Sequence, residues 1–166
     1  MGVIRRTIIA AVFGLLVLAA CGSGSNLDEP PEIFYGEDIC DHCNMIISEP
    51  RYAASYLTTD GTTRRFDDTG GLFLYHAEHN EDVHAFWVHD YESEEWIRAE
   101  SAFYVITSDV YTPMDHGVFA FGDEAGAAEF AEGSQESEIL GFGEVLAQAK
   151  EGNFEHEHHH EMHESP

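Results

Sequence analysis

The fold is decided by residues 52–88, which read YAASYLTTDGTTRRFDDTGGLFLYHAEHNEDVHAFWV. Strand-forming residues lie on both sides of Asp60-Gly61, a dipeptide that favours a tight two-residue turn, so the segment predicts a β-hairpin. Asp67 or Asp68 then stands where a helix N-cap belongs, and apolar side chains follow at helical spacing until Asn80. The final residues, VHAFWV, are rich in β-branched and aromatic types and predict a third strand. The expected order of elements is therefore β-β-α-β.

The same order recurs 55 residues further along the chain. We expect strands over 102–107 and 117–121, a helix over 124–132 capped by Asp123, and a last strand over 138–142. Four residue pairs match at this offset: Phe66 with Phe121, Asp68 with Asp123, Gly71 with Gly126, and Tyr75 with Phe130. The offset is too long for a solenoid repeat, so it indicates an internal duplication. The predicted fold class is α+β, with two similar β-β-α-β halves, about 38–91 and 92–150, packed as one domain.

A sulfur-rich stretch precedes the first hairpin and reads Asp38-Ile39-Cys40-Asp41-His42-Cys43-Asn44-Met45-Ile46-Ile47. Its Cys-x-x-Cys turn lets two sulfurs converge on one ion, and Met45 is close enough to add a third. Thiolate and thioether sulfurs are soft donors that select Cu(I), zinc or iron–sulfur clusters. Zinc sites are usually completed by further Cys or His, and the chain has no second Cys pair. We therefore predict a Cu(I) site at Cys40, Cys43 and Met45, with a structural disulfide or a redox dithiol as the alternatives.

A further sulfur ligand is expected between the two strands of the second half, where residues 111–117 read YTPMDHG. Met114 is flanked there by proline and glycine, and an exposed turn offers a methionine little packing. His42 and His116 stand beside these sulfurs, where they either complete the metal shell or take no part in it. The other histidines of the domain are interpreted as structural or surface residues: His76, His79, His84 and His89. Asp67-Asp68 is interpreted as a helix cap rather than a catalytic pair.

The N-terminal residues 1–20 have the pattern of a secretion signal, with Arg5 and Arg6 before an apolar run. Leu18-Ala19-Ala20-Cys21 resembles the lipobox of lipoproteins, which predicts lipid on Cys21. Residues 21–37 are rich in Gly, Ser, Pro and acids and predict a flexible tether. We thus expect a chain that is lipid-anchored on the outer face of the cytoplasmic membrane or in the periplasm.

Residues 151–166 are rich in His and Glu and predict a disordered tail that can bind metal without folding. Its candidate ligands form a secondary metal site: His156, His158, His159, His160, Met162 and His163.

The charge of the chain excludes one class of partner. Seven basic residues stand against 32 acidic ones among 166, which gives a formal net charge of −25. Nucleic acid is excluded because phosphate contacts need Lys and Arg in number. The chain also has no Gly-x-Ser-x-Gly elbow and no phosphate-binding loop, and we predict that it is not an enzyme.

These features together resemble the NosL family of copper-binding lipoproteins, which serve nitrous oxide reductase assembly. The resemblance rests on Cys21, on Cys40 to Ile47, on Arg65-Phe66-Asp67-Asp68, and on Thr112-Pro113-Met114 followed by Val118-Phe119-Ala120-Phe121. It implies two β-β-α-β halves, and it implies Cu(I) held by Cys43, Met45 and Met114, with Cys40 as a further candidate. The family usually has glycine where this chain has Asn44 and Asp115, and Asn tolerates a left-handed backbone better than most residues.

The function that the resemblance implies is a membrane-anchored Cu(I) metallochaperone. Its implied partners are an assembly machinery at the membrane and a client copper enzyme, nitrous oxide reductase. One alternative is an extracytoplasmic thiol–disulfide oxidoreductase, with Cys40 as the nucleophile and Cys43 as the resolving thiol. The other is a metal-scavenging lipoprotein whose functional part is the His-rich tail.

Overall fold

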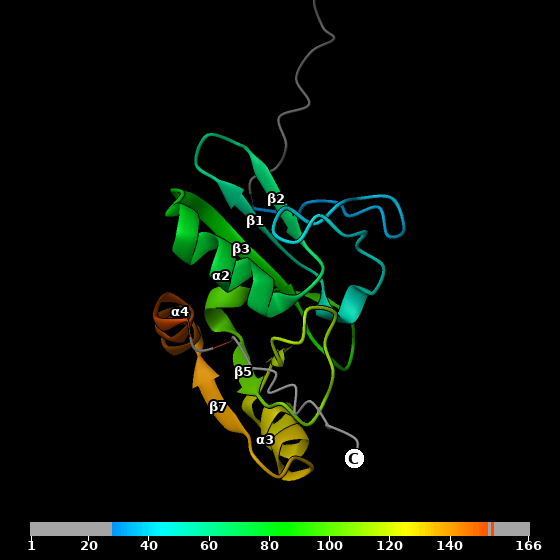
Figure 1. The fold of residues 1–166 in the computed structure, drawn as a ribbon, viewed down its shortest axis with the longest axis vertical. Helices are drawn as coiled ribbons and strands as arrows, with labels where there is room; N and C mark the ends of the chain where they lie inside the picture. The colour runs from blue at the N-terminus through cyan, green and yellow to red at the C-terminus, as the bar shows by residue number, and fades with distance from the viewer. Residues whose placement is uncertain (1–27, 153, 155–166) are drawn as a thin grey trace, which may run out of the picture.

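The computed structural model describes residues 28–152 and Phe154, which form two antiparallel sheets and three α-helices (Figure 1). The first sheet has the strand order β2-β1-β3-β4, and the second has the order β6-β5-β7. The signal segment, residues 21–27 of the tether and nearly all of the tail, including Cys21 and the tail histidines, lie outside the described residues. Within the described part of the chain, no helix is both long and apolar enough to cross a membrane.

The first half follows the predicted order. Strands β1 (Ala54–Thr58) and β2 (Thr63–Phe66) form the hairpin, and Gly61 takes a positive φ of 88° in its turn. Helix α2 (Thr69–His79) begins after Asp68, whose carboxylate accepts a hydrogen bond from the Gly70 N–H at 2.8 Å. The helix ends at Asn80, as predicted, and β3 (Val83–His89) returns antiparallel to β1.

The second half repeats this arrangement. Strands β5 (Phe103–Ile106) and β6 (Val118–Phe121) pair, helix α3 (Glu124–Glu132) is capped by Asp123, and β7 (Glu138–Gly141) pairs with β5. In each sheet the first strand of the half lies between the second and the third. The predicted α+β class and the duplicated order of elements are confirmed.

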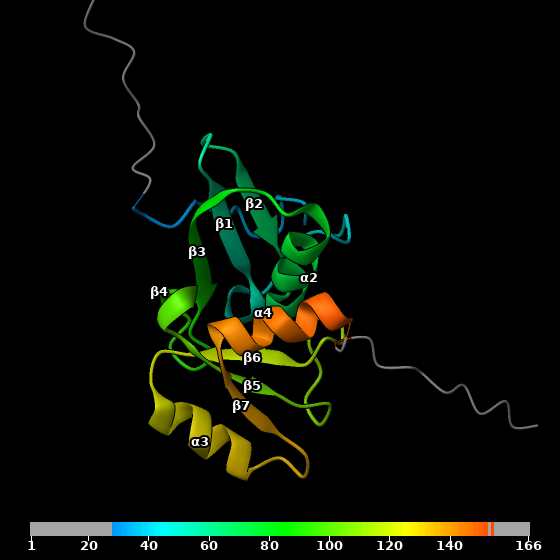
Figure 2. The same cartoon turned by 90° about the vertical axis from the view of Figure 1, so that its left-hand side faces the viewer.

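One strand and one α-helix were not predicted. Strand β4 (Trp96–Arg98) pairs with β3, so the first sheet continues beyond residue 91, where the sequence placed the boundary between the halves. Helix α4 (Phe142–Glu151) follows β7 directly, because the Glu144 carboxylate accepts from the Gly141 N–H at 2.8 Å and ends the strand there. Figure 2 shows α4 between α2 and the second sheet.

The prediction of a coreless segment from residue 151 onward is wrong for its first residues. Glu151 still belongs to α4, and the side chain of Phe154 is only 1% exposed within the main core. The free energy gained by burying a phenylalanine ring exceeds the conformational entropy lost in ordering it. The ring therefore holds the residues after α4 against the domain.

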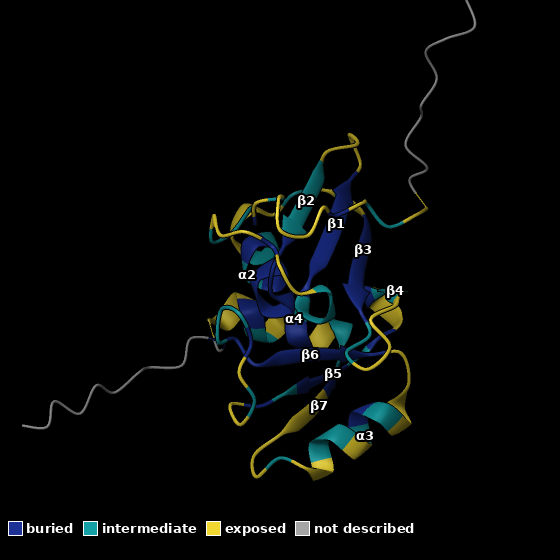
Figure 3. Cartoon of the chain, turned by 90° about the vertical axis from the view of Figure 1, so that its right-hand side faces the viewer, coloured by how far each residue is buried: buried dark blue, intermediate teal, exposed yellow. Residues whose placement is uncertain are grey.

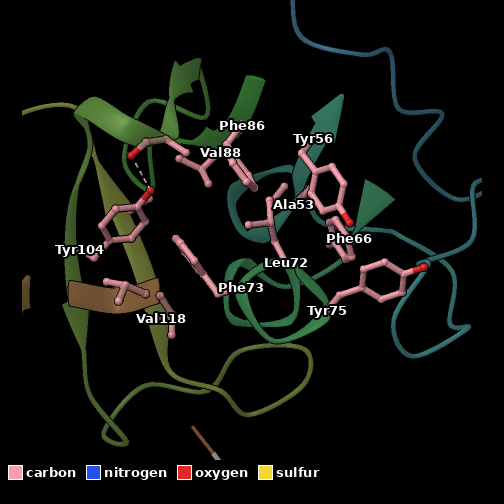
Figure 4. Packing of buried hydrophobic residues seen from close by; sticks show 14 of the residues in the cluster. Ala53, Tyr56, Phe66, Leu72, Phe73, Tyr75, Phe86, Val88, Tyr104 and Val118 are labelled. Carbon is pink, nitrogen blue, oxygen red and sulfur yellow. Dashed lines mark hydrogen bonds between the residues drawn. The ribbon is translucent and has the colours of Figure 1, made fainter. Parts of the chain in front are cut away.

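One cluster of buried side chains runs through both halves (Figure 4). Phe73 of α2 makes an edge-to-face contact with Tyr104 of β5, with ring centroids 5.3 Å apart, and lies 5.5 Å from the ring of Phe142. The Tyr104 hydroxyl donates to the Ala99 carbonyl at 2.7 Å, which satisfies its buried polar atom. The two halves therefore share a core.

Candidate metal site

The Cys-x-x-Cys segment forms a closed turn. The Cys40 N–H donates to the Met45 carbonyl at 2.8 Å, and the Asn44 N–H donates to the Cys40 carbonyl at 3.0 Å. Ile39 and Ile46 form an antiparallel bridge just outside these bonds. Asn44 has a φ of 62°, which is the left-handed conformation that the replacement of glycine by asparagine was expected to preserve.

Polar contacts fix this turn against β2. The Asp41 N–H donates to the Arg65 carbonyl at 2.8 Å, and the Arg65 N–H donates back to the Asp41 carboxylate at 2.8 Å. Arg64 adds an ion pair to Asp41 at 3.2 Å. Because β2 leads directly into α2, these bonds place both cysteines beside the first turn of the helix.

Cys40, Cys43 and Asp67 form the one group of potential metal ligands that the described residues bring within 4.8 Å of one another. The Cys43 sulfur lies 3.4 Å from each carboxylate oxygen of Asp67. Both cysteines are free thiols; Cys40 is 1% exposed, and Cys43 is partly buried. Asp67 was not among the predicted ligands. The signal was present, because Phe66-Asp67-Asp68 offers two acids and a helix needs only one as its cap.

Burial raises the pKa of both thiols. The pKa of Cys40 rises to about 12, mainly through desolvation, and the pKa of Cys43 is also raised by desolvation, with the Asp67 charge acting in the same direction. Both cysteines are therefore protonated at neutral pH. A nucleophilic cysteine needs the opposite environment, in which the thiol pKa is lowered.

The Met114 turn of the second half lies against the same end of α2. The Met114 N–H donates to the second carboxylate oxygen of Asp68 at 3.0 Å. Asp115 has a φ of 59°, so its position, like that of Asn44, is left-handed. Met114 is partly buried, whereas Met45 is 46% exposed. The structure thus brings the two sulfur-bearing turns to one helix terminus, as Figure 1 shows for the segment between β5 and β6.

His42 and His116 also meet at this terminus, with ring centroids 6.1 Å apart. The Nε2 atom of His116 is buried without a hydrogen-bond partner among the described residues. Burial, and then the charge of His116, lowers the pKa of His42, so its imidazole is neutral at pH 7. A Cβ atom at Gly70 would lie 2.4 Å from the Cβ of His116, which explains why only glycine fits at this helical position.

The remaining histidines have structural or surface roles, as predicted. His79 stacks on Tyr75 with ring centroids 3.8 Å apart. The Nδ1–H of His89 donates to the Glu94 carbonyl at 2.8 Å, and its Nε2 forms a hydrogen bond with the Tyr35 hydroxyl at 2.8 Å. His76 packs edge-on against Phe86, and His84 lies 3.6 Å from Asp28.

Large apolar side chains are exposed in the two segments that carry the sulfur residues. They are Phe34, Tyr35, Ile39, Met45 and Ile46 in the segment that carries the cysteines, and Tyr111 before the Met114 turn. Five of them are more than 40% exposed, and Tyr111 reaches 71%. We call this set the apolar rim.

Comparison with known proteins agrees with the resemblance drawn from the sequence. A family model described as NosL matches residues 32–149. The crystal structure of the copper chaperone NosL from Shewanella denitrificans is similar to this chain, with a TM-score of 0.61 and 20% identity. The match covers 69% of this chain and 94% of that chain, and at this identity it establishes the fold alone. No curated protein matches the chain.

Proposed function

The chain belongs to the NosL family, and we propose that it is a membrane-anchored metallochaperone that carries Cu(I) to an extracytoplasmic copper enzyme. The client we propose is nitrous oxide reductase. The family is non-enzymatic, in agreement with the prediction that the chain is not an enzyme.

The observation that carries this proposal is the convergence of soft ligands at one end of α2. Cys40 and Cys43 form one compact group with Asp67. The next residue, Asp68, accepts a hydrogen bond from the backbone N–H of Met114. Two thiols and a thioether are the donors that suit Cu(I). Because the ligands come from two turns rather than from one closed cage, a partner's ligands can enter while the ion is still held.

Copper uptake would exchange protons for metal. The thiols are protonated at neutral pH, so Cu(I) displaces a proton from each cysteine that binds it. Asp67, in contact with Cys43, is placed to accept that proton. The imidazoles of His42 and His116 can then supplement the sulfur ligands, and the uncharged Met45 and Met114 bind more weakly than a thiolate, which favours release.

Delivery would take place at the apolar rim. Its side chains belong to the segments that carry the cysteines and Met114 and include Met45 itself, so a protein that covers the rim would also reach the ion. Lipid on Cys21 and the tether that follows would hold this surface near a membrane-bound assembly machinery, on the outer face of the cytoplasmic membrane or in the periplasm.

The oxidoreductase alternative is disfavoured by the site. The raised pKa of Cys40 leaves almost no thiolate at neutral pH, and nucleophilic attack on a disulfide requires a thiolate. The histidines and Met162 of the tail, which would make it a metal scavenger, lie outside the described residues.

The test is an anaerobic Cu(I) titration, in competition with a chromogenic Cu(I) chelator, of reduced protein ending at Phe154. Cys43→Ser, Met45→Ala and Met114→Ala are compared with Ile46→Ala, an exposed rim residue that has no donor atom. We expect one tightly bound Cu(I) that weakens in the first three variants and persists in the control. Loss of all tight binding on removal of the tail would instead assign the function to the histidines. Binding that is insensitive to both methionine changes would exclude the thioether ligands.

A further inference from the structure

Asp68 joins the two halves beside the sulfur site. Its side chain is 0% exposed, and its two oxygens have different partners: one accepts from the Gly70 N–H at 2.8 Å, the other from the Met114 N–H at 3.0 Å. We infer that Asp68 is a positioning residue for copper binding, which holds the Met114 turn where its thioether can reach the ion. This inference rests on the proposed function.

The duplication supplies an internal comparison for this role. Asp123 occupies the equivalent position at α3, and its carboxylate accepts from the Gly126 N–H at 2.9 Å. Asp123 is exposed, and within residues 28–152 no segment of the other half donates to its carboxylate. A side chain that acts only as an N-cap therefore uses one carboxylate oxygen and can remain exposed. The second hydrogen bond of Asp68 is an addition found only at the helix that carries the sulfur site.

The Met114 turn has a shape of its own but depends on Asp68 for its place. Within the turn, the Asp115 N–H donates to the Thr112 carbonyl at 2.9 Å, and the Gly117 N–H donates to the Thr112 hydroxyl at 3.2 Å. Neither bond reaches the first half. The contact of His116 with Gly70 adds close packing at the same point but no polar anchor. The bond from Met114 to Asp68 thus fixes the distance between the two ligand-bearing turns.

Serine at position 68 separates the two roles of the aspartate. A serine hydroxyl caps a helix about as well as a carboxylate, but it has one oxygen and is too short to serve Met114 as well. The Met114 N–H would then lose its hydrogen-bond partner at a partly buried position. We expect the turn to move away and the thioether to bind less well.

The experiment is a double-mutant cycle of Asp68→Ser and Met114→Ala, measured by Cu(I) competition, with Asp123→Ser as the matched control. We expect Asp68→Ser to weaken Cu(I) binding by about tenfold, and to have little further effect once Met114 is alanine. Asp123→Ser should leave Cu(I) affinity unchanged. Equal weakening by Asp68→Ser in both backgrounds, or no weakening at all, would overturn the inference.

A metal-free measurement separates this inference from the proposed function. In the ¹³C-methyl spectrum of the apo protein, Asp68→Ser should shift and sharpen the Met114 signal, while the Met45 signal stays in place. Asp123→Ser should change neither. An unmoved Met114 signal refutes the positioning role even if copper binds as proposed. Met114→Ala that binds Cu(I) as tightly as the parent refutes the thioether ligand of the proposed function, and the copper role of Asp68 with it.

Discussion

Helices α2 and α3 occupy equivalent places in the two halves, and their surroundings differ. Helix α2 buries most of its first two turns, at Thr69, Gly70, Gly71, Leu72, Phe73 and Tyr75, whereas α3 buries Ala127. Helix α2 packs against its own sheet, α4 and β6, while α3 lies on the outer side of the second sheet with an exposed face (Figure 3).

The difference shows where a duplicated scaffold can build a site. Around the start of α3 lie acidic residues, Asp90, Glu92 and Asp123, and no sulfur. Turns from both halves also meet at the start of α3, where the Asp90 carboxylate accepts from the Gly122 N–H at 2.7 Å. Among the described residues, however, it is at the start of α2 that sulfur-bearing turns from both halves meet. The repeat supplies the helix and its cap, and the contact between the halves supplies the site.

The largest difference between the two helices is expected in the stability lost when an aromatic residue of each is replaced by alanine. Phe73→Ala in α2 should lower the free energy of unfolding by about 3–5 kcal/mol, because the ring is fully buried and contacts Tyr104 of the other half. Phe130→Ala in α3 should cost about 2 kcal/mol, because Phe130 is only partly buried. Urea unfolding of both variants at one salt concentration measures the difference. Equal losses would show that α2 is no more central than α3.

The end of the chain offers a second comparison, between truncation after Lys150 and truncation after Phe154. The shorter protein loses the ring of Phe154, which is 1% exposed in the core, and should be about 2–4 kcal/mol less stable. The longer protein should melt like the full chain. Phe154→Ala in the full chain is the control, and it should reproduce most of the loss. If it does not, the stabilisation comes from the last turn of α4 rather than from the aromatic ring.

Much of the fold could be predicted because its signals are local. The Asp60-Gly61 turn, the caps Asp68 and Asp123, and the αL residue Asn80 each mark a boundary that the structure confirms. Helix α4 and the place of Phe154 could not be predicted in this way. Residues 142–151 come directly after a segment that predicts a strand, so the start of a helix there is not marked. Phe154 is a single phenylalanine in an acidic segment, and its burial depends on the tertiary core into which it packs.

The same distinction between local and tertiary signals applies to the candidate metal site. Cys40 and Cys43 could be predicted from their spacing, and the structure places both in one group. Asp67 contacts Cys43, whereas Asp68 points toward Met114. These directions depend on the angle at which β2 leads into α2, and no local sequence pattern predicts that angle. Met45 and Met114 stay predictions as ligands, although the two turns that carry them lie at the same helix end.

The pH dependence of copper binding tests whether both cysteines take part. Each thiol that binds as a thiolate releases one proton, so the apparent Kd should fall about tenfold per pH unit for each such thiol. We expect a slope of two protons between pH 7 and 9, because burial raises the pKa of both Cys40 and Cys43 above that of an ordinary thiol, so that both are protonated before copper binds. His42 adds no proton there, since its pKa is lowered.

Cys40→Ser is the control for this slope and should reduce it from two protons to one. A parent slope of one that Cys40→Ser leaves unchanged would assign the metal to Cys43 alone. Cu(I) competition at fixed ionic strength across the range gives both slopes, and affinity that does not vary with pH would contradict binding as thiolates.

The smallest effects are expected at Asn44 and Asp115 in the two sulfur-bearing turns, where the resemblance drawn from the sequence implies glycine. Asn44 and Asp115 have φ values of 62° and 59°, a conformation that costs most L-residues about 1–2 kcal/mol and costs asparagine and aspartate less. Glycine removes that cost but loses more backbone entropy on folding, so Asn44→Gly and Asp115→Gly should each change stability by less than about 1 kcal/mol. Alanine offers neither advantage, and Asn44→Ala should be the least stable of the three. Thermal melts of the apo proteins, followed by circular dichroism, rank the variants. If Asn44→Ala and Asn44→Gly have the same melting temperature, the left-handed conformation does not explain why asparagine stands at this position. The residues Asn44 and Asp115 would then replace glycine for different reasons in the two turns.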